Sequence, residues 1–192
     1  MLNFRQNLLK FSEKMLRRRR RGRSAVVLPF FLDFRQRILV LLPEKANFPP
    51  LHEIIRRYQQ FFDGVPVQFV AHAGRAGDIP PDLQCIYYSE DSATIFGRLT
   101  PAIAGDLAHH DYQLAIDLND RFALIPALIC LKSGAPVRVS FDKPEGTFYY
   151  NVILRTNGEE YPVNLERMLG QLRAVIGRPE TAGARLDPVT VK

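Results

Sequence analysis

The sequence predicts an α/β fold: a single doubly wound, mostly parallel, Rossmann-like sheet of about five strands, preceded by an amphipathic basic helix. Two segments, 37–42 and 112–118, are almost wholly apolar, as is typical of parallel strands buried on both faces. Segments with helical periodicity alternate with these and other short apolar runs, which favours a parallel sheet with helices on both faces. The 192 residues suffice for one such domain with a hydrophobic core.

The first strand is predicted over 37–42, where a branched apolar run ends at Pro43. Residues 51–62 place apolar side chains at helical spacing, and the pair Asp63-Gly64 ends that helix. A second strand follows at 65–71. These three segments predict a βαβ unit with a right-handed crossover.

The next stretch is less regular. Residues 72–82 are rich in glycine and proline and predict a loop, followed by a short strand over 85–88. Helical turns are predicted over 92–96 and 100–108, and the second of these opens on a Thr-Pro pair suited to a helix start.

The segment 112–118 is the second strong strand, and Asn119-Asp120 is interpreted as the cap of an apolar helix that runs to Lys132. Pro126 should kink this helix or mark its effective start. Ser133-Gly134 ends it.

Three further elements complete the predicted domain over 36–176: a strand at 136–141, an extended segment at 148–154 and an amphipathic helix at 164–176. Residues 24–35 are expected to be a linker, and 177–192 a polar tail.

The basic charge is concentrated in one segment. Residues 1–20 predict a helix with a broad apolar side, and a basic run continues to the end of the tether 1–23. The run consists of Arg17, Arg18, Arg19, Arg20, Arg21 and Arg23. The chain has 26 basic and 20 acidic residues, so without these six arginines the remainder is neutral. The pI near 9.5 therefore does not make the whole domain a nucleic-acid-binding surface.

Several interpretations of the basic segment stay open. It can be a peripheral helix folded onto its own domain, with its arginines at the C-terminal end of the helix dipole. It can instead dock on an anionic surface, either phospholipid or the phosphate backbone of RNA or DNA. Its arginine-rich, acid-poor makeup also fits a cleaved organellar presequence.

Composition excludes several protein classes. The 46% apolar content excludes a wholly disordered chain, and no apolar stretch approaches the roughly 20 residues of a transmembrane helix. Cys85 and Cys130 are too few for a disulfide framework and are predicted to be buried thiols in a reducing compartment. The expected location is cytoplasmic, with peripheral membrane attachment as an option.

No metal site and no cofactor are predicted. His109-His110-Asp111 has no further ligand at a recognised spacing and is interpreted as surface. Residues 74–78 form a glycine-rich segment without a phosphate-loop signature and are interpreted as a connector. His52 and His72 are isolated in the sequence.

The strongest candidate site follows the strand at 112–118. Asp117, Asn119 and Arg121 are candidate ligand-binding residues, because doubly wound folds bind ligands at the carboxyl ends of their strands. The competing and favoured interpretation is structural: Asp117 and Asp120 cap the next helix and Asn119 shapes the turn.

Residues 111–141, DYQLAIDLNDRFALIPALICLKSGAPVRVSF, resemble a segment of family 9 glycosyltransferases, the ADP-heptose lipopolysaccharide heptosyltransferases. Tyr150-Asn151 resembles a pair that follows in that family, and a related single-domain α/β family is an alternative. Over about 36–176 the resemblance implies the N-terminal half of a GT-B enzyme. The matching residues are Tyr112, Leu114, Ile116, Asp117, Ser133, Gly134, Ala135, Arg138 and Phe141.

Two departures from that family argue against its reaction. The family has a Gly-Asp pair after its first strand, where the Asp is the expected base, but this sequence has PEKANFPP there. Glu44 is the only carboxylate in that loop, so Glu44 and Asp117 are weak candidate catalytic residues. About 16 residues after Ile176 are too few for the donor-binding lobe.

The sequence therefore predicts a non-catalytic binding or interaction domain, attached to an anionic partner or membrane surface through its basic helix. One alternative is half of a split sugar transferase whose donor lobe is a second protein chain. Another is an RNA- or DNA-associated protein that uses its arginine-rich segment.

Overall fold

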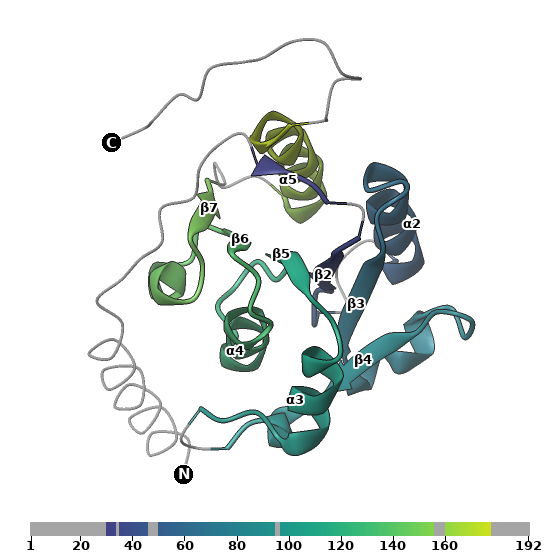
Figure 1. Cartoon of the computed structure of the whole chain (residues 1–192), viewed down its shortest axis with the longest axis vertical. Coiled ribbons are helices and arrows are strands. Elements are labelled where there is room, and N and C mark those ends of the chain that lie inside the picture. The colour runs from purple at the N-terminus through teal and green to yellow at the C-terminus, as the bar shows by residue number, and fades with distance from the viewer. Residues whose placement is uncertain (1–29, 34, 46–49, 95–96, 156–159, 178–192) are drawn as a thin grey trace.

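The computed structural model describes residues 30–33, 35–45, 50–94, 97–155 and 160–177. Its centre is a six-stranded, all-parallel sheet in the order β4-β3-β2-β5-β6-β7 (Figure 1). Its strands are β2 (Arg37–Leu41), β3 (Val67–His72), β4 (Cys85–Tyr88), β5 (Tyr112–Asp117), β6 (Val137–Phe141) and β7 (Val152–Leu154).

The chain enters this sheet in the middle. It runs outward from β2 to β4, returns to β5 beside β2, and then runs outward in the opposite direction to β7. This is the strand order of a Rossmann fold. The predicted doubly wound α/β fold is therefore confirmed, with six strands where about five were predicted.

Helices cover both faces of the sheet (Figure 1). On one face, α2 (Leu51–Phe61) and α5 (Tyr161–Val175) pack into one hydrophobic cluster with the strands. On the other, α3 (Pro101–Ala108) and α4 (Leu124–Lys132) pack into a second cluster. Two separate apolar layers therefore enclose the sheet.

Side-chain alternation along β2 explains why the run 37–42 is so apolar. Ile38 and Val40 face the cluster under α2 and α5, whereas Leu39 and Leu41 face the cluster under α3 and α4. All four are fully buried, and burial of each such side chain contributes about 1.5–3 kcal/mol. A polar residue on either face would lose that contribution.

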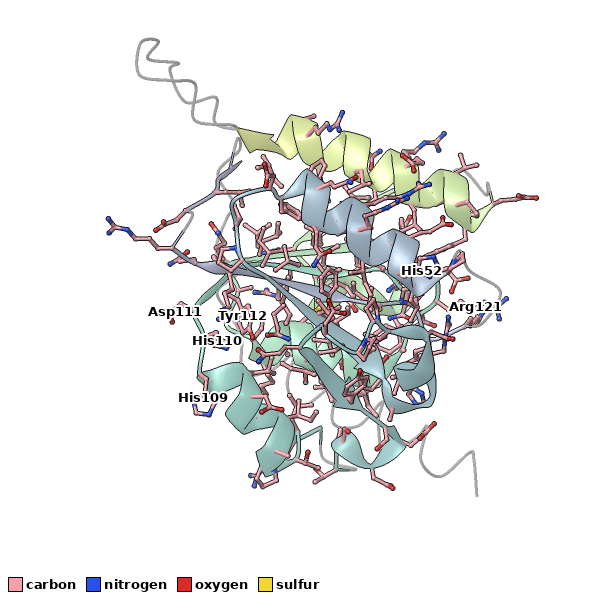
Figure 2. The ribbon with its side chains drawn as sticks, turned by 90° about the vertical axis from the view of Figure 1, so that its right-hand side faces the viewer. His52, His109, His110, Asp111, Tyr112 and Arg121 are labelled. Atoms are coloured by element: carbon pink, nitrogen blue, oxygen red, sulfur yellow. The ribbon has the colours of Figure 1, made fainter. Side chains whose placement is uncertain are left out.

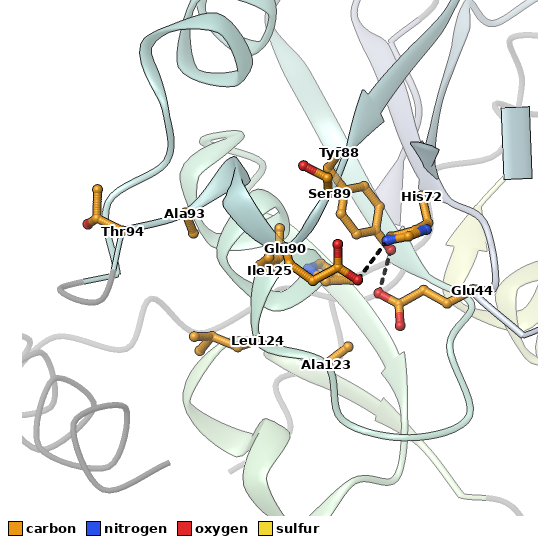
Figure 3. Close-up of a pocket in the computed structure, with 11 residues that line it drawn as sticks. Glu44, His72, Tyr88, Ser89, Glu90, Ala93, Thr94, Ala123, Leu124 and Ile125 are labelled. Atoms are coloured by element: carbon orange, nitrogen blue, oxygen red, sulfur yellow. Dashed lines mark hydrogen bonds and ion pairs between the residues drawn. The ribbon is translucent and has the colours of Figure 1, made fainter. Parts of the chain in front are cut away.

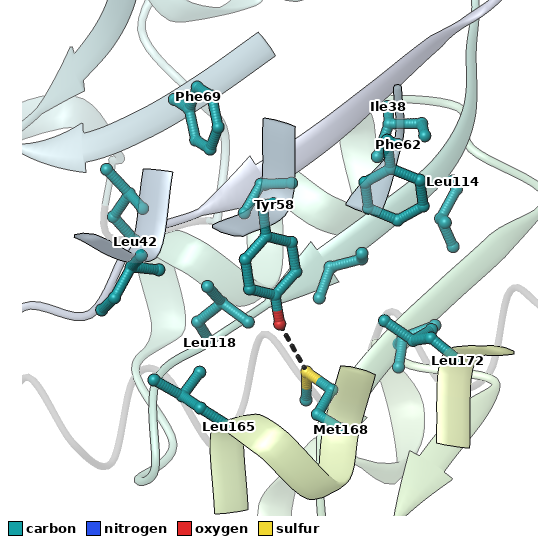
Figure 4. Close-up of a cluster of buried hydrophobic side chains, with 14 of the residues drawn as sticks. Ile38, Leu42, Tyr58, Phe62, Phe69, Leu114, Leu118, Leu165, Met168 and Leu172 are labelled. Atoms are coloured by element: carbon teal, nitrogen blue, oxygen red, sulfur yellow. Dashed lines mark hydrogen bonds between the residues drawn. The ribbon is translucent and has the colours of Figure 1, made fainter. Parts of the chain in front are cut away.

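The α2–α5 layer is joined by an aromatic side chain that crosses it (Figure 4). Tyr58 of α2 donates its hydroxyl hydrogen to Met168 Sδ of α5 at 3.4 Å. Both side chains are buried among the strand residues, and Leu165 and Leu172 lie on either side of Met168. The polar end of the tyrosine therefore has a partner inside an otherwise apolar layer.

Several predicted elements need correction. The helix after β5 is not capped by Asn119-Asp120: α4 begins at Leu124, its N-cap is Ala123, and no side chain caps it. Pro126 lies in its first turn, where the missing N–H is not needed, so it marks the effective start of the helix.

The irregular middle contains short 3-10 helices. The predicted loop 72–82 includes η1 (Ala73–Asp78). The helical turn predicted at 92–96 is wrong in its described part: η2 (Glu90–Ser92) ends where that turn should begin, and Ala93 is extended and forms an antiparallel bridge with Leu99. Thr100 is the N-cap of α3 as predicted, although its side chain makes no capping hydrogen bond.

The C-terminal third also differs in detail. The extended segment predicted at 148–154 is mostly the end of η3 (Pro144–Phe148) and a turn, with only β7 forming strand. Helix α5 begins three residues before 164, with a proline in its first turn. Two residues of the predicted linker form β1 (Phe30–Phe31), which pairs in parallel with β8 (Ile176–Gly177).

The predicted helix 1–23, the linker residues 24–29 and the tail residues 178–192 lie outside the described part of the chain. Within that part, no helix is both long and apolar enough to cross a bilayer.

Candidate functional site

The topological switch point lies between β2 and β5. These strands pair in parallel, and the chain leaves them toward opposite edges of the sheet. In doubly wound folds the loops at this point separate, and ligands bind beside the carboxyl ends of the strands. The predicted candidates Glu44, Asp117, Asn119 and Arg121 all follow or end these two strands.

Asp117 is not available to a ligand. Its side chain is 0% exposed, and its Oδ2 accepts hydrogen bonds from Lys143 Nζ at 2.7 Å and from the Tyr150 hydroxyl. Its Oδ1 accepts from the backbone N–H and the side-chain amide of Asn119, at 3.0 and 2.8 Å. The carboxylate is saturated by these four donors, so it neither contacts a ligand nor caps α4.

Lys143 is as deeply buried as its partner, with 1% of its side chain exposed. It lies two residues after the end of β6, and its ammonium nitrogen is also 5.3 Å from the centre of the Tyr150 ring. The pair ties the carboxyl end of β5 to the loop after β6. Burial raises the pKa of Tyr150 well above its ordinary value, as does the neighbouring Asp117 charge, so the phenol stays a neutral donor.

Asn119 connects the two loops of the switch point. Its side-chain oxygen accepts the backbone N–H of Glu44 at 2.9 Å, while its amide donates to Asp117. Only 4% of the residue is exposed, so it is a brace and not a ligand contact. Arg121 is exposed and contributes nothing to this network (Figure 2). The brace explains why Asn119 cannot cap α4.

A pocket opens beside this brace, with a cavity volume of about 280 Å³. Its polar end is formed by the residues that end or follow β2, β3 and β4, namely Glu44, His72 and Tyr88, together with Glu90 (Figure 3). The described residues that complete the lining are Ser89, Ala93, Thr94, Ala123, Leu124, Ile125 and Pro126.

Glu44 is held by Tyr88, whose hydroxyl donates to Glu44 Oε1 at 2.7 Å. Burial is the main cause that raises the pKa of Tyr88, and the Glu44 charge raises it further. The tyrosine therefore remains protonated and acts as a fixed donor. Asn119 positions the backbone of Glu44 and Tyr88 positions its carboxylate.

His72 is oriented by a hydrogen bond to Nδ1, the ring nitrogen that does not face Glu90. Its Nδ1 accepts the backbone N–H of Gly74 at 3.1 Å, so in the neutral imidazole the proton sits on Nε2. That nitrogen lies 3.4 Å from Glu90 Oε1, and the ring packs edge to face on Tyr88 with centroids 5.5 Å apart. The imidazole thus presents an N–H donor at the pocket.

The glycine-rich segment 74–78, interpreted from the sequence as a connector, lies in the 3-10 helix η1. Arg75 donates to the backbone carbonyls of Glu44 and Lys45, and its Nε bonds Asp78. It therefore straps η1 to the loop after β2, and its guanidinium is engaged by these partners.

The segment His109-His110-Asp111 and the two cysteines are absent from the described lining of the pocket. His109, His110 and Asp111 lie together at the far end of β5 (Figure 2), and no cluster of three metal-ligating side chains occurs in the part of the chain that the structure describes. Burial raises the pKa of Cys85 to about 12 and that of Cys130 still more clearly. Cys130 is buried as predicted, whereas Cys85 is only half-buried, and both thiols stay protonated at neutral pH.

Sequence reasoning missed His72, Tyr88 and Glu90. Each looks isolated along the chain, because they converge only when β3 and β4 align beside β2. One available signal was that a histidine directly follows the strand predicted at 65–71, two residues before a glycine.

No protein-family model matches the chain, and no significant match occurs among curated proteins. The resemblance to family 9 glycosyltransferases therefore stays a prediction drawn from the residues of β5, α4 and β6.

Proposed function

We propose that this chain is a ligand-binding domain without catalytic activity, built like the N-terminal half of a GT-B glycosyltransferase. Its small-molecule ligand occupies the pocket beside the switch point. Residues 1–23 attach the domain to an anionic partner, either phospholipid or nucleic acid, because the rest of the chain is neutral on average.

The observation that carries this proposal is that hydrogen bonds fix the polar side chains at one end of the pocket. Three adjacent parallel strands each deliver one polar side chain there, and two of these are fixed by a dedicated hydrogen bond from Tyr88 or Gly74. Binding benefits from such preorganisation, because a side chain that is already ordered loses less entropy when the ligand arrives.

The walls of the pocket support the same proposal. The N-terminal part of α4 and Ala93 add apolar surface to the lining. A mostly apolar concavity with a few placed polar groups is the usual form of a small-molecule site. Its volume of about 280 Å³ suits a compact molecule.

A fragment screen by ligand-observed NMR tests the proposal. Ala123→Trp places an indole at the lining, whereas Ala102→Trp adds the same group on an exposed position of α3 outside it. We expect fragments that bind the native chain and the Ala102→Trp variant but not the Ala123→Trp variant. If Ala123→Trp displaces no fragment, the pocket is not a binding site.

Glu44 favours one second candidate, the split sugar transferase. It follows β2, the position of the base in the family that the sequence resembles, and its carboxylate lines the pocket. This candidate predicts sugar transfer from an ADP-sugar once a donor-binding chain is supplied, and loss of transfer in Glu44→Gln. Transfer that persists in Glu44→Gln would exclude Glu44 as the base.

A further inference from the structure

We infer that the pocket selects a small organic cation, such as a primary ammonium group on a compact apolar body; this rests on the proposed function. Two carboxylates, Glu44 and Glu90, stand at its polar end. No lysine or arginine occurs among the described residues that line it.

Glu44 has one carboxylate oxygen available for a ligand. Its Oε1 accepts from Tyr88, and no residue in the described ranges bonds its Oε2. The carboxylate is half-buried, where a charge is less screened than at the surface. A ligand ammonium can therefore donate to the second oxygen without displacing the tyrosine.

The nearby positive charges are engaged elsewhere. Lys143 is buried against Asp117, Arg75 bonds Asp78 and two backbone carbonyls, and Lys45 lies 3.9 Å from Asp120. None of these cations neutralises the pocket from within its lining.

Two groups at the pocket, the N-terminus of α4 and His72, disfavour a bound cation, and each has a weaker effect than the carboxylate charge that attracts it. The N-terminus of α4 contributes about half a positive charge to the lining, against the full negative charge of Glu44. His72 Nε2 is directed at Glu90, whose side chain is 74% exposed at the rim. The cation preference therefore rests on Glu44, whose carboxylate is more buried than that of Glu90.

The apolar part of the lining determines the chemistry of the rest of the ligand. The apolar residues among the described lining are Ala93, Ala123, Leu124, Ile125 and Pro126. An ammonium ion with no apolar part would leave this wall in water. A single ring that carries an aminomethyl group satisfies both ends and is compatible with the volume of the cavity.

Three probes of one shape and different charge test this inference: benzylamine, benzyl alcohol and benzoate, titrated at pH 7 into the full chain by protein-observed NMR. We expect benzylamine to bind most tightly and Ala123→Trp to abolish its binding. Glu44→Gln should weaken it roughly ten- to hundredfold, because a hydrogen bond between charged groups is lost. Glu145→Gln, an exposed carboxylate outside the lining, is the matched control and should leave the affinity unchanged.

The outcomes separate the two claims. If benzoate or benzyl alcohol binds as well as benzylamine, and Ala123→Trp blocks it, the cation preference is wrong and the binding site stands. If benzylamine affinity is equal in Glu44→Gln and Glu145→Gln, the ammonium does not use Glu44 and the inference is overturned. If neither these probes nor any fragment gives a response that Ala123→Trp removes, both the inference and the proposed function fail.

Discussion

Replacing Lys143 by methionine should destabilise the fold strongly, because it leaves the Asp117 charge buried without its counter-ion. At an effective dielectric constant of about 20, the attraction across the 2.7 Å between Lys143 Nζ and Asp117 Oδ2 is about 6 kcal/mol, before the desolvation of both ions is subtracted. Removing one partner of a buried pair costs about 3–5 kcal/mol. That loss is a large fraction of the roughly 5–15 kcal/mol that stabilises a typical domain.

The charge itself can be separated from the packing by a second variant. In Asp117→Asn/Lys143→Met both ions are removed, while the side-chain oxygen of residue 117 can still accept from Asn119. We expect this double variant to recover at least half of the loss, because no uncompensated charge remains buried. Urea unfolding followed by circular dichroism gives the free energy of unfolding for each variant.

Lys132→Met is the matched control, since Lys132 is exposed at the end of α4 and its loss should change the free energy of unfolding by about 0.5 kcal/mol or less. The reasoning is refuted if Lys143→Met costs less than about 1 kcal/mol. It is equally refuted if the double variant is no more stable than Lys143→Met alone.

Four further outcomes are expected. Gly74→Ala should shift the NMR signals of His72, because a Cβ there would stand 3.0 Å from His72 Nδ1; Gly77→Ala, whose Cβ would have nothing within 4 Å, should not. Cys85 and Cys130 should resist iodoacetamide at pH 8 until the chain unfolds. The same raised pKa values make the folded state keep protons that the unfolded state releases, so the free energy of unfolding should fall as pH rises above about 9. Replacing the six arginines within 17–23 by glutamine should weaken cosedimentation with anionic vesicles at low salt, or else binding to RNA; unchanged binding to both would exclude the tether.

Local sequence patterns were sufficient for most of the fold. The apolar run of β5 and the helical spacing of α2 each encode burial directly, because period and polarity report which faces are covered. The short elements were less predictable. β7 has three residues and follows a 3-10 helix, so it carries too little periodicity to be separated from its neighbours.

The candidate site was less predictable than the fold, because its contacts join residues from different elements. Asp117 was correctly singled out as an unusual carboxylate at a strand end, but its partners Lys143 and Tyr150 lie 26 and 33 residues further along the chain. Only the pairing of β5 with β6 brings them together. Without these partners, a ligand contact and a helix cap were both reasonable interpretations, and neither is correct.

The carboxyl edge of the sheet is divided into two halves with different roles. At β5 and β6 the charges of Asp117 and Lys143 satisfy each other inside the protein, so this half contributes order and leaves nothing for a ligand. At β2, β3 and β4 the polar groups are held by neighbours but still face a cavity. Asn119 connects the two halves, because it donates to Asp117 and accepts from the backbone N–H of Glu44. The ordered network at β5 and β6 therefore also helps to fix the position of Glu44. Substitutions in the network of Asp117 and Lys143 should therefore mainly lower the stability of the fold, and substitutions among the pocket side chains should mainly weaken ligand binding.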